Sequence, residues 1–465
     1  MTAVEPVPTA TDARAAETDG LPKPRRYFAI LTIWLAIGMA VLDGSVANVA
    51  LPTIGRELGA DPAASIWIVN AYQLAITVAL LPLAALGDRL GYRRVYIAGL
   101  VVFTLGSLAC ALSQTLPQLT AARVLQGLGG AGVMSINAAL LRFTYPQSSL
   151  GRGIGLNAVV ISVAAAVGPT VASAILAASS WQWLFAINVP IGVLTVVIAI
   201  RALPFTQGSH APFDWTSAAL NAVAFGGLIL GVETLAREGS ASGAAMLAVG
   251  GLAAVLLARR ELNRVAPLVP FDLLRIPVFR LSILTSVVSF TAQMLAFVAL
   301  PFYFQGVLGR SAVDTGFLMT PWPIAVGIAA PLAGRLADRF NVGVLGAIGL
   351  GVFATGLACL AALPDAASNL DVIWRMGLCG LGFGFFQAPN NRAIVSSAPR
   401  ARSGAAGGML ATARLLGQTG GAVTVAILFH AGLSRPTPTA LAIAAGIAVL
   451  AAALSLLRVR TPTVV

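Results

Sequence analysis

Long apolar segments recur along the chain and constrain its fold more than any other feature. Each is about 18 to 25 residues long, the length that an α-helix needs to cross roughly 30 Å of hydrocarbon. Charged residues make up 10% of the chain, against about a quarter in an ordinary soluble domain. Lipid offers no hydrogen-bond partners to a peptide backbone, so these segments are expected to be membrane-spanning helices.

We predict fourteen such helices, so the expected fold class is an all-α integral membrane protein. Segment 243–260 is the shortest of them. The predicted spans are 27–51, 65–86, 94–113, 118–141, 153–177, 182–203, 215–235, 243–260, 280–303, 314–334, 342–362, 371–392, 403–429 and 439–457.

The arginines indicate how these helices are oriented. If the N-terminus is cytoplasmic and the loops alternate, the outer loops hold only Arg56, Arg237, Arg310 and Arg435, and most other basic residues face the cytoplasm. This is the positive-inside distribution. It predicts a multi-pass protein of the bacterial plasma membrane with both termini inside. It also accounts for the net charge of +12 without a nucleic-acid partner.

Several landmarks recur at offsets of 249 to 252 residues. VALP at 49–52 returns at 298–301, Asp88 returns as Asp338, and Arg123 returns as Arg375. The first six predicted spans together cover fewer residues than this offset. Two further predicted helices account for the difference. The predicted architecture is therefore six, two and six helices. The predicted parts are a disordered cytoplasmic tail (1–26), a six-helix bundle (27–204), two inserted helices (205–265) and a second six-helix bundle (266–460).

Five motifs give the chain a resemblance to a known family. They are LDGSVANVALP (42–52), GDRLGYRR (87–94), RVLQGLGGAG (123–132), VGPT (167–170) and WQWLFAINVPIG (181–192). With them the chain resembles the major facilitator superfamily, and within it the fourteen-helix drug:proton antiporters of the QacA/EmrB type. The resemblance implies two halves related by an axis along the membrane normal, with the substrate site between them.

Asp43 is the candidate proton-coupling residue. A bare carboxylate inside a membrane helix is costly, and such residues are usually functional. Arg123 and Gln126 lie one turn apart on another predicted helix and share a face. Arg123 and Asp43 lie about 9 Å and 13 Å below the outer ends of their helices, at about 1.5 Å per residue. The resemblance places both helices on one cavity, so we expect Asp43 to contact Arg123 or Gln126.

Two further motifs are candidates for conformational roles. In GDRLGYRR, Gly91 permits a tight turn. Asp88 can accept from Arg89 or Arg93, or it can face the N-terminal end of another helix, for which the helix starting at Ser403 is a candidate. The plain alternative is that Arg93 and Arg94 serve only topology. The resemblance implies a gating loop that latches helix ends. In VGPT, Gly168 and Pro169 predict a kinked, closely packed helix. The resemblance makes this the antiporter motif, although its trailing glycines are replaced here.

Asn48, Gln293 and Arg414 are candidates for lining the cavity. Arg414 lies deep in its predicted helix, where it either repels cations or pairs with an acid that the sequence does not identify. The repeat carries Asp43 onto Ala292, beside Gln293, so the acid is not duplicated. Arg375, with Asp371 one turn before it, is read as structural. Glu233 and Asp314 are read as interfacial.

Nothing in the sequence points to an enzyme or a bound cofactor. The three cysteines lie in apolar segments, and the two histidines lack the spacing of metal ligands, so we expect no metal site and no catalytic residue. A Walker P-loop is absent, so ATP is not the expected energy source.

The function predicted from the sequence is proton-coupled multidrug efflux by alternating access. The expected partners are the bilayer, protons and hydrophobic or amphipathic small molecules, and the protein is expected to be a monomer. One alternative is a dedicated exporter of a single host metabolite or antibiotic. Another is a proton-coupled importer. A membrane enzyme or a non-transporting sensor fits the sequence less well, because neither gives Asp43 a purpose.

Overall fold

The computed structural model describes residues 20–146, 149–206, 208, 213–238, 240–262, 271–337, 339–364, 366–398 and 403–460. Every element in these ranges is a helix or a short 3-10 turn. Residues 1–19 of the predicted tail lie outside the described residues. The first helix already begins at Lys23, because Pro24 is favourable in a first helical turn. The prediction that the tail extends to residue 26 is therefore wrong.

The first helices form what we call the N-terminal group. The second membrane span of this group is broken near Ile66, where α3 ends and α4 begins. The group comprises α2 (Lys23–Glu57), α3 (Pro62–Ser65), α4 (Trp67–Leu90), α5 (Tyr92–Leu112), α6 (Leu116–Thr144), α7 (Leu150–Ala178), α8 (Trp183–Ala186) and α9 (Asn188–Ala202).

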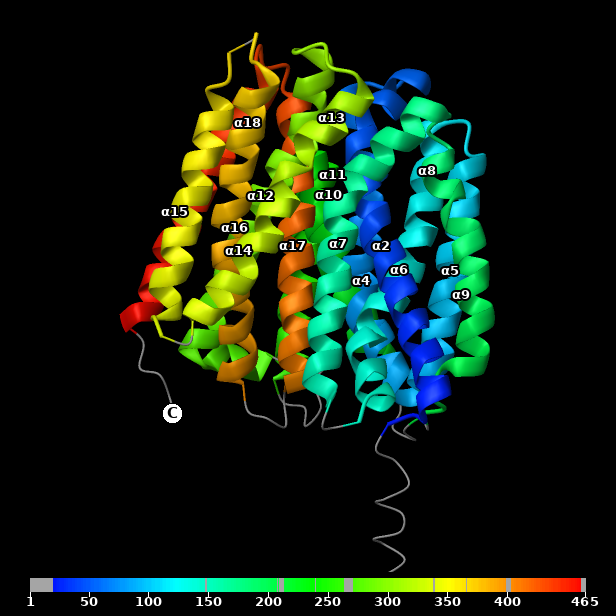
Figure 1. Ribbon diagram of the computed structural model, residues 1–465. Helices are drawn as coiled ribbons and strands as arrows, with labels where there is room; N and C mark the ends of the chain where they lie inside the picture. Colours follow the sequence, from blue (N-terminus) through cyan, green and yellow to red (C-terminus); the bar gives the residue numbers. More distant parts are fainter. Residues whose placement is uncertain are drawn as a thin grey trace, which may run out of the picture.

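The last helices form the C-terminal group. Its second span is also broken, near Thr320. The start of α2 and the end of α18 lie at the same end of the helix bundle (Figure 1). The group comprises η2 (Phe271–Arg275), α12 (Pro277–Gly306), α13 (Ala312–Met319), α14 (Pro321–Leu336), α15 (Val342–Ala361), α16 (Asn369–Ser397), α17 (Ser403–His430), α18 (Pro436–Leu457) and η4 (Arg458–Arg460).

The repeat seen in the sequence has a counterpart in the packing of the two groups. A Cβ added to Gly129 of α6 would lie 2.2 Å from the backbone nitrogen of Phe103 on α5. A Cβ added to Gly382 of α16 would lie 2.3 Å from the backbone nitrogen of Phe353 on α15. Small residues allow helices to approach this closely in a membrane. The same glycine-mediated contact thus holds the matching helix pair in each group.

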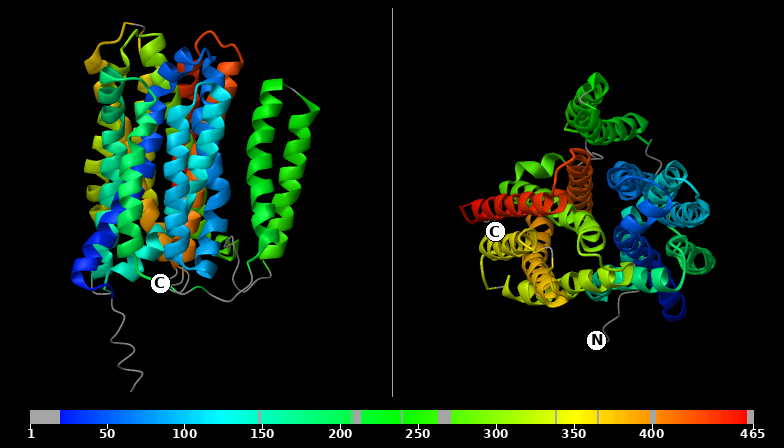
Figure 2. Two further views of the ribbon diagram at one scale, coloured as in Figure 1. Left: turned by 90° about the vertical axis from the view of Figure 1, so that its right-hand side faces the viewer. Right: turned by 90° about the horizontal axis from the view of Figure 1, so that it is seen from above.

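Two helices lie between the groups in the sequence and beside them in space. They are α10 (Trp215–Glu238) and α11 (Ala241–Glu261), which pack tightly on each other. Figure 2 shows this hairpin at the edge of the molecule, next to α4 and α17. Trp67 of α4 donates to Glu233 of α10 at 2.8 Å. Glu233 is only 4% exposed, so it is a buried anchor of the hairpin rather than an interfacial group.

Among the described residues, twelve spans are long and apolar enough to cross a membrane. The helices α16 and α17 are not among them. Charged residues, among them Arg375 and Arg392, lower the hydropathy of α16, and Arg414 and Gln418 lower that of α17. These two helices therefore combine membrane length with polar residues, which is the composition expected of helices that face a polar interior.

Candidate functional site

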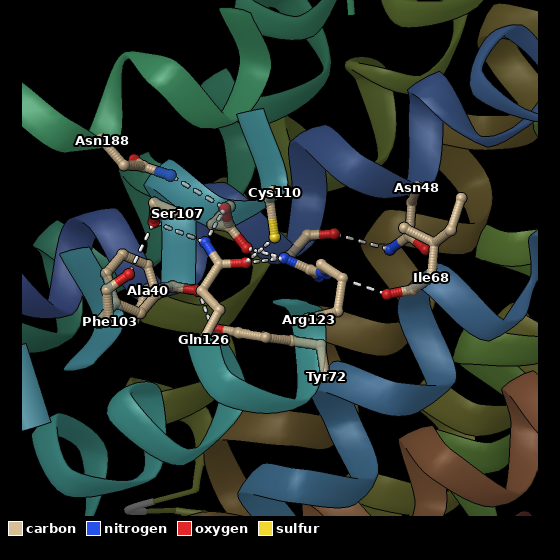
Figure 3. A network of polar contacts seen from close by, with 12 residues as sticks. Ala40, Asn48, Ile68, Tyr72, Phe103, Ser107, Cys110, Arg123, Gln126 and Asn188 are labelled. Carbon is tan, nitrogen blue, oxygen red and sulfur yellow. Dashed lines mark hydrogen bonds and ion pairs between the residues drawn. The ribbon is translucent and has the colours of Figure 1, made fainter. Parts of the chain in front are cut away.

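Asp43 lies in the middle of α2 and is only 2% exposed. Three side chains donate to its carboxylate. Arg123 pairs with Oδ2, Gln126 donates to Oδ1 at 2.8 Å, and Asn188 donates to Oδ1 at 2.9 Å (Figure 3). A buried carboxylate is stable only when it is paired and hydrogen-bonded. The structure therefore brings Asp43 into contact with both residues that the sequence offered as alternatives.

Arg123 of α6 is completely buried, and its guanidinium is held on several sides. Its Nε donates to the carbonyl of Ile68 at 2.9 Å, and its Nη1 donates to Oε1 of Gln126 at 2.6 Å. Its Cζ lies 4.1 Å from the ring centroid of Tyr72 and 5.5 Å from that of Phe185. Aromatic faces stabilise a desolvated cation. The α2, α4, α6 and α8 helices thus fix one charge together.

Gln126 connects the ion pair to α5. Its Nε2 donates to Ser107 at 2.8 Å as well as to Asp43, and its Oε1 also accepts from the thiol of Cys110 at 3.6 Å. Every group in this network belongs to the N-terminal group of helices. The network is therefore complete within one half of the protein, and it can change its protonation without direct contact from the other half.

Sequence reasoning missed several members of the network. Asn188 stands in the INVPIG motif at the start of α9, and an amide in an apolar segment was the available signal. Tyr72, Ser107 and Cys110 carried no such signal. Their roles depend on how α4 and α5 are rotated about their axes, and a single apolar segment does not define that rotation.

The network depends on the charge of Asp43. Its three donors bond most strongly to an ionised carboxylate. If Asp43 gains a proton, Arg123 loses its counter-charge and the donors of Gln126 and Asn188 lose their preferred acceptor. A protonation event at Asp43 would therefore loosen contacts among α2, α6 and α9.

A row of polar side chains on α4 faces the C-terminal group. Asn70, Gln73 and Thr77 share a face at helical spacing. Gln73 contacts the sulfur of Met294 on α12 at 3.9 Å, and the hydroxyls of Thr77 and Thr419 on α17 lie 3.4 Å apart. We call the zone where this face of α4 meets α12 and α17 the seam.

The seam contains polar atoms that lack partners among the described residues. Both amide atoms of Asn70 and the Oε1 of Gln73 have no hydrogen-bond partner there. Asn70 is 1% exposed, and Gln73 is 8% exposed. Buried polar atoms are nearly always satisfied, so unsatisfied ones mark a place where another molecule can bind.

The three candidate cavity residues have different surroundings. Asn48 is buried on α2 and donates to the carbonyl of Gly44 at 3.0 Å, while its Oδ1 has no partner among the described residues. Gln293 of α12 and Arg414 of α17 are half-buried. Ala292, which matches Asp43 in the repeat, is fully buried in an apolar cluster. The structure does not bring these three residues together into one described pocket.

Pro169 lies inside α7, and the helix continues through it. A Cβ on Gly168 would lie 2.4 Å from the Cβ of Ser45 on α2. A Cβ on Gly316 of α13 would lie 2.4 Å from the carbonyl oxygen of Pro169. The VGPT motif therefore lies where α7 packs closely against both α2 and α13 of the C-terminal group. Its role in antiport stays a prediction.

The contacts of the predicted gating loop differ from the expected ones. Asp88 accepts from the hydroxyl of Tyr92 at 2.5 Å, not from Arg89 or Arg93. Arg93 donates instead to the carbonyl of Ile200 at the end of α9. Gly91 has a φ of 91°, which few residues other than glycine adopt. The turn was predicted correctly, but the expected Asp88–arginine pair is absent among the described residues because Tyr92 lies one turn away and takes its place.

Other groups give no further candidate centre. Among the residues that the structure describes, no three His, Cys, Asp or Glu side chains are grouped so as to hold a metal ion. Asp371 forms a capping box with Ser368 at the start of α16. The guanidinium of Arg375 lies over the ring of Trp374 at 5.1 Å. These contacts are those of a helix end.

We predict that the buried pair is energetically coupled. Arg123→Met should destabilise the protein by about 3–5 kcal/mol, because it strands a buried carboxylate. Adding Asp43→Asn should recover part of that loss. Thermal unfolding of the single and double variants in detergent measures the coupling. Arg94→Met, at an exposed position near the start of α5, is the control and should change little. Strict additivity of the two single effects would contradict the coupling.

Comparisons with known proteins agree with this architecture. The profile of the Major Facilitator Superfamily matches residues 33–422. The chain is 54% identical over 96% of its length to the uncharacterized transporter YebQ of Escherichia coli (strain K12), of which it covers 98%. It is 31% identical over 88% of its length to multidrug resistance protein Stp of Mycobacterium tuberculosis (strain CDC 1551 / Oshkosh), covering 77% of that protein.

Two further similarities complete the comparison. The chain is 28% identical over 84% of its length to the riboflavin transporter RibZ of Clostridioides difficile (strain 630), covering 86% of it. It superimposes with a TM-score of 0.68, at 14% identity, on a bacterial homologue of the human lysosomal transporter Spinster, with 95% of this chain and 98% of that chain covered. The chain is therefore a multi-pass membrane protein of the major facilitator superfamily, a transporter and not an enzyme.

Proposed function

We propose that the protein is a proton-coupled exporter of hydrophobic or amphipathic small molecules. The observation that carries this proposal is the Asp43 network. It places one titratable carboxylate in the middle of the membrane helices, fully buried and held by three donors. Intramembrane acids of this kind mark proton pathways. A proton that enters down a membrane potential releases about 2.3 kcal/mol per 100 mV, which would drive the export.

The network is connected to the seam through Tyr72. The ring of Tyr72 stacks on Arg123, and its hydroxyl donates to the carbonyl of Ala40 at 3.1 Å. The neighbouring residue, Gln73, faces α12. Protonation of Asp43 would free Arg123 to shift, and Tyr72 would carry that shift to the polar face of α4. This is a physical route from proton binding to the substrate site.

Alternating access requires contacts between the two groups that can open. At the face opposite the chain ends, Gln305 of α12 accepts from Thr53 at 3.2 Å and from Arg56 at 3.1 Å, both on α2. On the same side, Thr170 and Thr320 lie 3.0 Å apart across α7 and the C-terminal group. An apolar cluster with members from both groups lies beside these polar contacts. The polar contacts are of the kind that a rocking motion between two rigid halves can break and reform.

A single-substrate transporter is the second candidate. The relative RibZ is named for riboflavin, whereas Stp is named for multidrug resistance. Both candidates use the same proton site, and they differ only in how many compounds the seam accepts. We further propose that the protein works as a monomer in the bacterial inner membrane, with no bound cofactor and with protons as its coupling partner.

The proton-coupling proposal predicts that Asp43→Asn folds but loses uphill transport. The neutral amide fits the same space, yet it cannot release a proton. Efflux of a fluorescent dye from vesicles with an imposed pH gradient measures this, and export by the variant should fall to the rate without a gradient. Glu233→Gln, which changes another buried carboxylate in a membrane helix, is the control and should keep gradient-driven export. Full gradient-driven efflux by Asp43→Asn would exclude Asp43 as the coupling site.

We also propose fourteen membrane helices arranged as six, two and six. In this arrangement 27–204 and 266–460 are the two bundles, 205–265 is the inserted hairpin, and both termini are cytoplasmic. The hairpin packs against the outside of the seam and holds no group of the Asp43 network, which supports its assignment as an insertion.

This topology predicts opposite accessibility at the two ends of α10. Phe205 precedes α10 and is exposed, and Ser242 at the start of α11 is also exposed. In a variant without the three native cysteines, a membrane-impermeant maleimide should label Ser242→Cys in intact cells. It should label Phe205→Cys only in inverted vesicles. Labelling of both from the same side would remove α10 from the set of membrane-spanning helices.

A further inference from the structure

Arg414 is a cation in the interior of α17 with no acid to match it. It lies eleven residues after Ser403, or about 16 Å along the helix at 1.5 Å per residue. Its side chain is half-buried. Among the described residues it makes no hydrogen bond and no ion pair. The sequence left open whether Arg414 has an acidic partner, and the structure provides none in the described part of the chain.

The acids that the structure describes do not balance this charge. Of the described acids, Asp43 alone lies more than about two turns from the end of its helix, and it is already paired with Arg123. Glu233 lies near the end of α10 and is bonded to Trp67. Arg414 is therefore an unmatched positive charge in the interior of the described helices.

The position of Arg414 relates this charge to the seam. Arg414 stands five residues before Thr419 on α17, and the Thr419 hydroxyl lies 3.4 Å from that of Thr77 on α4. On α4, the Oε1 of Gln73 and both amide atoms of Asn70, one turn before it, have no partner among the described residues. The unpaired cation and the unpartnered amide atoms thus stand on two helices that pack against each other where the two halves meet.

We propose that the seam binds amphipathic molecules that carry an anionic group and rejects lipophilic cations. The anionic group would pair with Arg414, and neutral polar groups would bond to Asn70 and Gln73. In a region of low dielectric an unmatched cation attracts an anion strongly and repels another cation to the same degree. The inference rests on the proposed export function and names its substrate class. A membrane potential that is negative inside also favours the outward movement of an anion.

Binding of two dyes with a common ring system tests the proposal. Carboxyfluorescein is an anionic xanthene dye, and rhodamine 6G is a cationic one. Fluorescence anisotropy with the purified full-length protein in detergent gives both dissociation constants. The wild type should bind the anionic dye at least about tenfold more tightly than the cationic dye, the margin expected of one charge-assisted contact.

Variants at Arg414 then assign the preference to this residue. Arg414→Gln keeps a polar side chain without charge, and it should lose at least about tenfold in affinity for carboxyfluorescein. Arg414→Lys keeps the charge and should retain most of the preference. Arg435→Gln, at an exposed helix start, is the control and should leave both affinities unchanged. The preference of the wild type tests the proposal even if Arg414→Gln does not fold.

The outcomes separate this inference from the proposed function. Equal or tighter binding of rhodamine 6G by the wild type would overturn the inference, as would no binding of carboxyfluorescein or an unchanged preference in folded Arg414→Gln. None of these results involves a proton gradient. A preference for the anion without any gradient-driven transport would instead leave the inference standing and remove proton coupling.

Discussion

The buried pair of Asp43 and Arg123 is the interaction on which the N-terminal group depends. Either charge alone in the membrane interior would be costly, because it would lose several kcal/mol of hydration without compensation. The chain meets this constraint by bringing donors and aromatic rings from α4, α6, α8 and α9 to one point on α2. The arrangement of these helices and the stabilisation of the two buried charges therefore depend on each other.

The two halves share a helix framework but differ in the charged groups that they carry. Matching glycines hold α5 to α6 and α15 to α16 at the same close approach. At the position that matches Asp43, however, the C-terminal group has Ala292 in an apolar cluster. The N-terminal group thus holds the matched charges, and the C-terminal group supplies the unmatched Arg414 at the seam. In our proposals, proton binding therefore belongs to the N-terminal group and charge selection to the contact between the halves.

Much of the fold and part of the Asp43 network could be predicted from the sequence, because a lipid environment permits few backbone structures other than helices. Apolar length predicted the membrane helices. The depth of Asp43 and Arg123 below their helix ends, together with the resemblance that places both helices on one cavity, predicted that the two side chains meet. The rotation of each helix about its axis could not be predicted. For this reason Asn188 and Tyr72 were missed, Asp88 was given the wrong partner, and the burial of Glu233 was not foreseen. A donor one turn away, such as Tyr92, competes with more distant donors for the same carboxylate. Sequence spacing alone does not show which donor will bind.

The central claim is that Asp43 gains and loses a proton. Infrared difference spectroscopy between acidic and alkaline pH detects the carbonyl band of a protonated, buried carboxyl group in the purified protein. The account predicts a band in the wild type that is absent from Asp43→Asn and unchanged in Glu233→Gln. Identical difference spectra for the wild type and Asp43→Asn would mean that Asp43 keeps one protonation state, and this result would contradict the account.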